Sequence, residues 1–200
     1  MKASLSDVLQ RAGEFFMGQS PIHAAAARIA KALSEMDVPF CIAGALAVNV
    51  HGHMRTTEDV DILLTPNGLE RFKSRWLGRG WVEQFPGSRR LRDAVHGVNV
   101  DVRLTGDYPG DGQPKPVAFP PPADVNEPDP QGIPVLTLPA LLALKLASGM
   151  TAPHRPRDLD DVIQLVRENG LDRAYAEKLD PYVRRKYLEL WEAAQVQDEY

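Results

Sequence analysis

Residues 43–64 read AGALAVNVHGHMRTTEDVDILL and decide the fold. The apolar run 38–43 leads into them and predicts a buried strand that ends at Gly44. Residues 45–51 then predict a short helix, and residues 60–64 predict a second strand. A strand, a glycine bend, a short helix and another strand therefore follow one another closely.

Two carboxylates stand on the second of these strands. Asp59 and Asp61 are two residues apart, so their side chains share one face of the strand. Carboxylates held this close repel each other unless a proton or a cation lies between them. Oxygen ligands of this kind suit Mg²⁺, which also binds substrate phosphates. Asp101, on the alternating segment 98–104, is a candidate third carboxylate if that segment lies beside the first strand.

A structural interpretation competes with this metal site. An isolated Asp-x-Asp pair can mark the edge of a strand, or it can pair with Arg55. The glycine bend favours the functional interpretation. Gly44 lets a phosphate approach the backbone, and the helix that follows favours negative charge at its start.

The remaining elements predict an α+β fold. A small mixed β-sheet is flanked by helices, and a helical C-terminal part follows. Nine of the seventeen prolines fall in residues 109–134, which therefore predict an extended loop. We expect an α/β core at 1–134 and a helical part at 135–200. The predicted helices are 6–16, 22–36, 69–77, 138–148, 157–168 and 172–194; the further strands are 81–85, 89–94 and 98–104; and the turns are 65–68 and His96-Gly97.

Composition excludes several classes of protein. The chain has 200 residues, 44% of them apolar, which is enough for a core. The net charge of −4 argues against a generic basic nucleic-acid binder. The single cysteine, Cys41, excludes a disulfide framework. Residues 1–16 lack the apolar segment of a signal peptide, and prolines and a lysine interrupt the apolar window 133–149, so we expect a cytoplasmic protein with no membrane partner.

The order of these motifs resembles the nucleotidyltransferase superfamily with the DNA polymerase β-like fold. Within it, residues 43–64 look like the minimal nucleotidyltransferases of prokaryotic mobile and toxin–antitoxin systems. The segments LTLPALLALKLASG (136–149) and RPRDLDDVIQLV (155–166) resemble AbiEii-type toxin proteins. The resemblance covers about residues 36–168.

The resemblance implies roles for the residues of the motif. Gly44 and the backbone at Ala45 would cradle the triphosphate of an NTP. Asp59 and Asp61 would hold Mg²⁺. Asp101 would complete a second metal position, or would orient and deprotonate the acceptor hydroxyl. Two such metal ions stabilise the attacking and the leaving oxygen of an in-line displacement.

Four further residues have two interpretations each, and His51 has one. Lys145 either contacts the triphosphate or extends into solvent at a helix edge. Arg55 either contacts phosphate or balances the carboxylates. Asp158 and Asp161 either cap the start of a helix or orient Lys145 and the substrate. His51 ends the short helix and packs near the nucleotide pocket, because no cluster of zinc ligands accompanies it.

The function implied by the resemblance is Mg²⁺-dependent transfer of NMP from an NTP to an acceptor hydroxyl. The acceptor would be a tRNA or a protein, in a toxin-like reaction with a possible antitoxin partner. A first alternative is an inactive nucleotide-binding or interaction module, because Ala45 stands where many relatives have Ser or Gly and Arg103 is placed to neutralise Asp101. A second is an antibiotic nucleotidyltransferase, because members of that group share a similar run, which here goes from Gly52 through Arg55 to Asp59 and Asp61.

Basic residues gather in the middle of the chain. They form either an ordinary solvated surface or a phosphate-contacting face for an RNA acceptor. No base-reading module accompanies them, so sequence-specific binding is not predicted. The residues are Arg71, Lys73, Arg75, Arg79, Arg89, Arg90 and Arg92.

Overall fold

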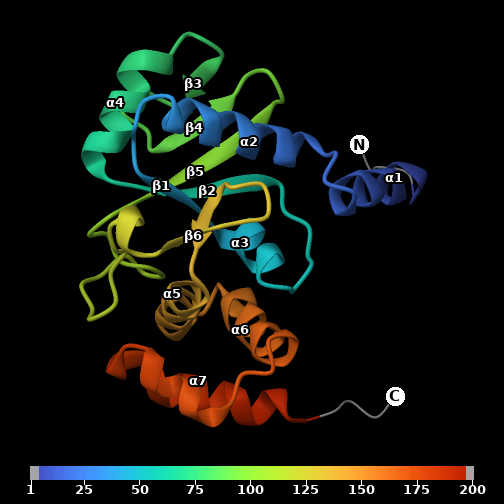
Figure 1. Cartoon of the computed structure of the whole chain (residues 1–200), viewed down its shortest axis with the longest axis vertical. Coiled ribbons are helices and arrows are strands. Elements are labelled where there is room, and N and C mark those ends of the chain that lie inside the picture. Colours follow the sequence, from blue (N-terminus) through green and yellow to red (C-terminus); the bar gives the residue numbers. More distant parts are fainter. Residues whose placement is uncertain (1–4, 197–200) are drawn as a thin grey trace.

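The structure, a computed structural model, describes residues 5–196. Residues 1–4 and 197–200, at the ends of the two predicted parts of the chain, lie outside this range. Within it, the strands form one mixed sheet in the order β3-β4-β5-β2-β1-β7-β6 (Figure 1). The strands are β1 (Phe40–Ala43), β2 (Asp59–Leu64), β3 (Trp81–Glu83), β4 (Arg90–Asp93), β5 (Val98–Leu104), β6 (Asn126–Pro128) and β7 (Pro134–Leu136).

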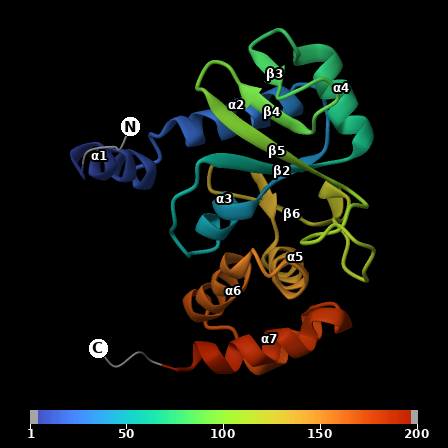
Figure 2. The ribbon, with the colours of Figure 1, turned by 180° about the vertical axis from the view of Figure 1, so that it is seen from behind.

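Helices lie on both sides of this sheet. Figures 1 and 2 show α2 on one side of β1 and β2, and α3 on the other. Helices α5, α6 and α7 pack against one another beyond α3. The helices are α1 (Leu5–Phe16), α2 (Pro21–Ser34), α3 (Gly44–Val50), α4 (Pro66–Trp76), α5 (Leu138–Thr151), α6 (Pro156–Glu168) and α7 (Pro181–Ala194), with short 3₁₀ turns η1 (Pro122–Asp124) and η2 (Arg173–Lys178).

The centre of the sheet confirms the predicted α+β class. β1 pairs with β2 in an antiparallel register that sets Ala43 opposite Asp61. β2 pairs with β5 in a parallel register that sets Asp61 beside Asp101. Along β5 the valines and the final leucine are buried while the residues between them are half-buried, as the period-two pattern predicts. The hairpin between β4 and β5 turns at Gly97, whose φ is 71°.

The predicted turn at residues 65–68 is wrong. These residues begin helix α4 instead. The Thr65 side chain accepts a hydrogen bond from the Gly68 backbone nitrogen at 3.0 Å, which caps the helix. Pro66 occupies the first helical turn, where its missing N–H costs nothing. The same residue types serve a turn and a helix start, so the pattern alone was ambiguous.

The proline-rich stretch 109–134 is not loop throughout. It contains β6 and the start of β7, which pair antiparallel at one edge of the sheet. Pro128 and Pro134 face each other at the end of this pairing, where ladder hydrogen bonds are dispensable. The predicted boundary at residue 135 falls inside β7, and the chain beyond that strand is helical.

The single helix predicted at 172–194 is also wrong. The chain forms η2, breaks at Leu179–Asp180 and starts α7 at Pro181. The Asp180 side chain accepts from the Tyr182 backbone nitrogen at 2.8 Å and caps the new helix. Pro181 disfavours helical geometry in the residue before it, so the break belongs there.

Among residues 5–196, no helix is both long enough and apolar enough to span a bilayer.

A buried ion pair joins α2 to the sheet. Asp93, at the end of β4, has a fully buried side chain that pairs with Arg28 of α2. His96 Nδ1 lies 2.6 Å from the other carboxylate oxygen. The Arg28 guanidinium also stacks 4.7 Å from the ring centre of Trp81. One carboxylate therefore holds a helix and a hairpin together.

We predict that Asp93→Ala lowers the free energy of unfolding by about 3 kcal/mol, because it leaves the partly buried Arg28 without its carboxylate partner. Urea denaturation measures the change. Asp160→Ala, at an exposed position on α6, is the control and should change stability by less than about 0.5 kcal/mol. Equal stability of the two variants would contradict the assignment.

Candidate active site

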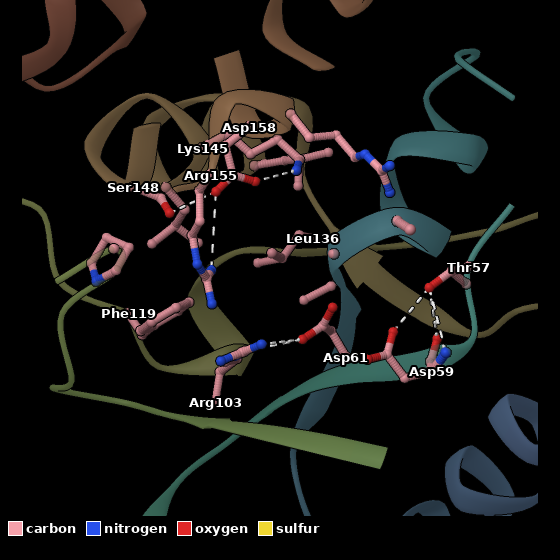
Figure 3. Close-up of a pocket in the computed structure, with 18 of the residues that line it drawn as sticks. Thr57, Asp59, Asp61, Arg103, Phe119, Leu136, Lys145, Ser148, Arg155 and Asp158 are labelled. Carbon is pink, nitrogen blue, oxygen red and sulfur yellow. Dashed lines mark hydrogen bonds and ion pairs between the residues drawn. The ribbon is translucent and has the colours of Figure 1, made fainter. Parts of the chain in front are cut away.

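A cavity of about 300 Å³ lies between the end of β1, strand β2 and helices α5 and α6 (Figure 3). Part of the proline-rich segment closes one side through Tyr108, Pro109, Gly110 and Phe119. The cavity brings together seven of the residues singled out from the sequence: Gly44, Ala45, Arg55, Asp59, Asp61, Lys145 and Asp158. His51, Asp101 and Asp161 do not line it.

The glycine bend is shaped to receive Asp61. Gly44 joins β1 to α3 with φ of 59°, in the left-handed region. A Cβ atom at this position would lie 2.1 Å from Oδ2 of Asp61 and 2.8 Å from its Cβ. The carboxylate of Asp61 therefore occupies the space that any side chain at residue 44 would need. Both the backbone conformation and the packing require glycine here.

The three predicted carboxylates lie on neighbouring strands, as expected, but each has a partner. Arg103 donates to Oδ1 of Asp61 from Nε at 3.0 Å and from Nη2 at 2.7 Å. The same Nη2 lies 3.7 Å from Asp101. Oγ1 of Thr57 donates to Asp59 at 2.9 Å. The sequence suggested that Arg103 neutralises Asp101. In the structure Arg103 lies closer to Asp61 than to Asp101 and mainly neutralises Asp61.

A second arginine holds Asp101. Nε of Arg90, on β4, forms an ion pair with Oδ1 of Asp101 at 2.6 Å, and its Nη2 lies 3.5 Å from Asp59. Arg90 and Asp101 are direct partners across the β4–β5 pairing. Burial raises the pKa of Asp101. The negative charges of Asp61 and Asp59 raise this pKa further, and Arg90 and Arg103 offset only part of the rise.

Lys145 is fixed from the opposite wall of the cavity. Its ammonium donates to Asp161 at 2.5 Å and to Asp158 at 3.0 Å. The Lys145 side chain is 7% exposed, so it does not extend into solvent at a helix edge. No side-chain cap is present at the start of α6, so Asp158 orients Lys145 rather than capping the helix.

Arg55 joins the same cluster. Its Nε lies 2.8 Å from Oδ1 of Asp161, and its Nη2 donates to Oδ2 at 3.0 Å. Asp161 is fully buried between Arg55 and Lys145. The idea that Arg55 balances Asp59 and Asp61 is therefore wrong, because its carboxylate partner comes from α6.

Asp158 is stabilised in its charged form. Burial alone would raise the pKa of Asp158, but Lys145, the Ser148 hydroxyl and Arg155 together hold it below its usual value. Ser148 Oγ donates to this carboxylate at 2.6 Å.

His51 supports the site from outside. It caps the end of α3, and its Nε2 lies 2.7 Å from the Leu136 carbonyl oxygen. Leu136 belongs to β7 and lines the cavity. His51 therefore links the helix after the glycine bend to the strand before α5.

The donor set fits Mg²⁺ only in part. Within residues 5–196, no group of three His, Cys, Asp or Glu side chains is gathered to hold a metal ion. Asp59 and Asp61 do face the cavity as a pair, and Mg²⁺ is commonly held by one or two carboxylates plus substrate phosphates. A two-carboxylate site completed by a nucleotide therefore fits, while Asp101 stays paired with Arg90.

Sequence reasoning missed several residues that shape the site. Arg90 was grouped with a basic surface, although it faces Asp101 across the hairpin at His96-Gly97. Only the antiparallel register after that turn could have indicated the contact. Thr57, Ser148, Arg155 and Phe119 were not singled out, because nothing local marks them as cavity residues.

The fold and the site together define the class of protein. A mixed sheet, a glycine bend leading into a short helix and an Asp-x-Asp strand beside a basic wall characterise a nucleotidyltransferase. The family model described as "Nucleotidyl transferase AbiEii toxin, Type IV TA system" matches residues 28–198. The chain belongs to this AbiEii family.

One solved structure shares the fold, and two others are less similar to the chain. The crystal structure of ANT(2")-Ia in complex with adenylyl-2"-tobramycin is 11% identical with a TM-score of 0.51, over 80% of this chain and 92% of that one. Two Helicobacter pylori proteins have lower TM-scores. A putative nucleotidyltransferase has 16% identity and a TM-score of 0.44, covering 86% and 92% of the chains. JHP933 has 17% identity and 0.46, covering 86% and 89%. No curated protein matches the sequence.

We predict that Gly44→Ala abolishes binding of Mg²⁺ and nucleotide, because the new methyl group displaces Asp61. Gly170→Ala is a matched control, since Gly170 has a similar φ of 55° but open space around its Cβ position. Both variants should lose about 1–2 kcal/mol of stability from backbone strain, and Gly44→Ala should lose more, because its Cβ would also lie 2.8 Å from the Cβ of Asp61. Isothermal titration calorimetry should detect binding only in the Gly170 variant; binding in both would refute the packing argument.

A pH dependence follows from Asp158. Its lowered pKa contributes stability above its unfolded-state pKa of about 3.9, and this contribution is lost as the pH falls through the folded-state value. The stability difference between the wild type and Asp158→Asn should therefore stay constant from about pH 7 to pH 5 and shrink as the pH falls further. Urea denaturation across this range measures it. A difference that grows on acidification would show that the ion pairs do not stabilise the charged form.

Proposed function

We propose that this nucleotidyltransferase moves NMP from an Mg²⁺-bound NTP to an acceptor hydroxyl and releases pyrophosphate. The observation that carries the proposal is the division of one cavity into two walls. Asp59 and Asp61 line it from β2, and Lys145, whose ammonium is held by Asp158 and Asp161, lines it from α5. A metal-bound triphosphate carries both charges that such a cavity would recognise.

Different residues of the cavity would bind the metal ion and the phosphates. Asp59 and Asp61 would hold Mg²⁺, which neutralises negative charge on the transferred phosphoryl group when it is bound. The backbone at Gly44 and Ala45 leaves room for phosphate oxygens. Lys145 binds phosphate as a point charge whose position is held by the carboxylates of α6.

The opening of the cavity adds positive charge. Arg155 and Arg157, at the start of α6, line the cavity and are exposed. Figure 3 shows the Arg155 guanidinium reaching toward Phe119 and Arg103. These arginines would guide an anionic substrate into the cavity. Their positive charge would also weaken the repulsion between this substrate and the carboxylates of Asp59 and Asp61.

The acceptor that we propose is a hydroxyl of tRNA or of a protein. Membership of a toxin family in type IV systems supports a growth-inhibiting role in the cytoplasm and a cognate antitoxin. The fold is also that of ANT(2")-Ia, whose structure contains adenylyl-2"-tobramycin. An aminoglycoside hydroxyl is therefore included in the test below as an alternative acceptor.

One observation favours a second candidate, an inactive module of the same fold. Arg90 and Arg103 occupy the carboxylates of Asp101 and Asp61. If these pairs persist when nucleotide binds, the acidic face has too little free charge for metal-assisted transfer. Such a protein would bind an NTP without turnover.

The protein should be incubated with each α-³²P-labelled NTP, Mg²⁺ and total tRNA, with a cell protein extract, or with tobramycin. We expect label on tRNA or protein. Asp59→Asn and Asp61→Asn should each lower the rate at least about 1,000-fold, because each removes a metal ligand. Asp160→Asn, on an exposed face of α6, should retain full activity.

The alternatives give different results. Label on tobramycin alone would identify an antibiotic-modifying enzyme. Nucleotide binding without any transfer would identify the inactive module. Label from a γ-³²P NTP on the acceptor would contradict nucleotidyl transfer, because pyrophosphate, not NMP, carries that phosphorus.

A further inference from the structure

The acidic face of the sheet carries its own counter-ions. Three carboxylates, those of Asp59, Asp61 and Asp101, meet two guanidinium groups, those of Arg90 and Arg103. All five side chains are partly shielded, with between 20% and 39% of each exposed. The cluster therefore has a net charge close to −1 before any ligand binds.

The two arginines differ in their access to the cavity. Arg103 lines it and points at Asp61 there, as Figure 3 shows. Arg90 and Asp101 do not line it. Arg103 is therefore placed to meet a ligand in the cavity, while the Arg90–Asp101 pair lies outside the cavity lining.

This charge balance disfavours a bare divalent cation. A cation at the Asp59–Asp61 pair would find the Asp61 carboxylate already hydrogen-bonded to the Arg103 guanidinium. The positive charge of Arg103 would repel this cation. A triphosphate changes the balance, because it supplies several negative charges and accepts bidentate hydrogen bonds from a guanidinium. The same arginine then has a partner other than Asp61.

We propose that Arg103 is an internal counter-ion that blocks metal binding at Asp61 until the triphosphate of an NTP takes it over. Metal and nucleotide consequently bind together, with Arg103 moving from the carboxylate to a phosphate oxygen. Arg90 stays on Asp101 and keeps that carboxylate out of the metal shell. The proposal rests on the proposed function, since it assigns a positioning role within the same site.

The test measures metal binding rather than turnover. Mn²⁺ replaces Mg²⁺, and free Mn²⁺ is measured by electron paramagnetic resonance with and without a non-hydrolysable NTP analogue. In the presence of the analogue, the wild type should bind Mn²⁺ with an affinity at least tenfold higher than that of the analogue alone, measured without protein. Arg103→Gln should bind Mn²⁺ alone at least tenfold more tightly than the wild type, and should bind the analogue at least tenfold more weakly.

Two control variants separate charge from geometry. Arg103→Lys keeps the positive charge and should leave binding of Mn²⁺ alone as weak as in the wild type. Arg92→Gln removes an exposed arginine on the neighbouring strand β4, whose side chain contacts Asn99, and should change neither measurement. Circular dichroism confirms that each variant is folded.

The outcomes distinguish this proposal from the proposed function. Equal binding of Mn²⁺ alone by the wild type and Arg103→Gln would overturn the counter-ion role while leaving nucleotidyl transfer intact. Tight binding of Mn²⁺ alone by the wild type would overturn it too, even if the glutamine variant failed to fold. Failure of the wild type to bind the Mn²⁺–analogue pair at all would overturn the proposed function itself.

Discussion

The parallel register of β2 and β5 is the constraint on which the site depends. It sets Asp61 directly beside Asp101 on one half-buried face of the sheet, with Asp59 two residues away. Carboxylates at this spacing are unstable together in a shielded place unless positive charge accompanies them. The β4–β5 hairpin supplies that charge through Arg90, and β5 itself supplies Arg103. The acidic face is thus stable without metal, and a ligand must compete with these arginines.

A second set of buried charges attaches the C-terminal helices to the site. Asp161 is fully buried and bonds both Lys145 of α5 and Arg55 from the segment before β2. An unpaired charge in this position would be costly, so the three groups stabilise the arrangement only as a set. The helices after residue 135 therefore build one wall of the cavity. The Gly44 bend and β2 build the other.

The sequence predicted local features wherever one residue type has one physical meaning. The alternation along β5, the break at Gly44 and the turn at Gly97 were all found, because side-chain periodicity and positive φ are local properties. Residues 65–68 and the helix predicted at 172–194 were wrong, because threonine and proline serve turns and helix starts equally. The strands within 109–134 were missed because they pair only with distant segments.

By itself the sequence determined the class of fold and the acidic pair Asp59 and Asp61 on one strand, and it left two interpretations open for Lys145 and for Asp158. Only the tertiary structure decided which charges neutralise which. Arg55 pairs with Asp161 and not with Asp59 or Asp61, which are nearer in the sequence, and Arg90 pairs with Asp101. The physical reason is that ion pairing depends on distance and burial, which strand register and helix packing set. A sequence lists the charges, but the fold determines their separation.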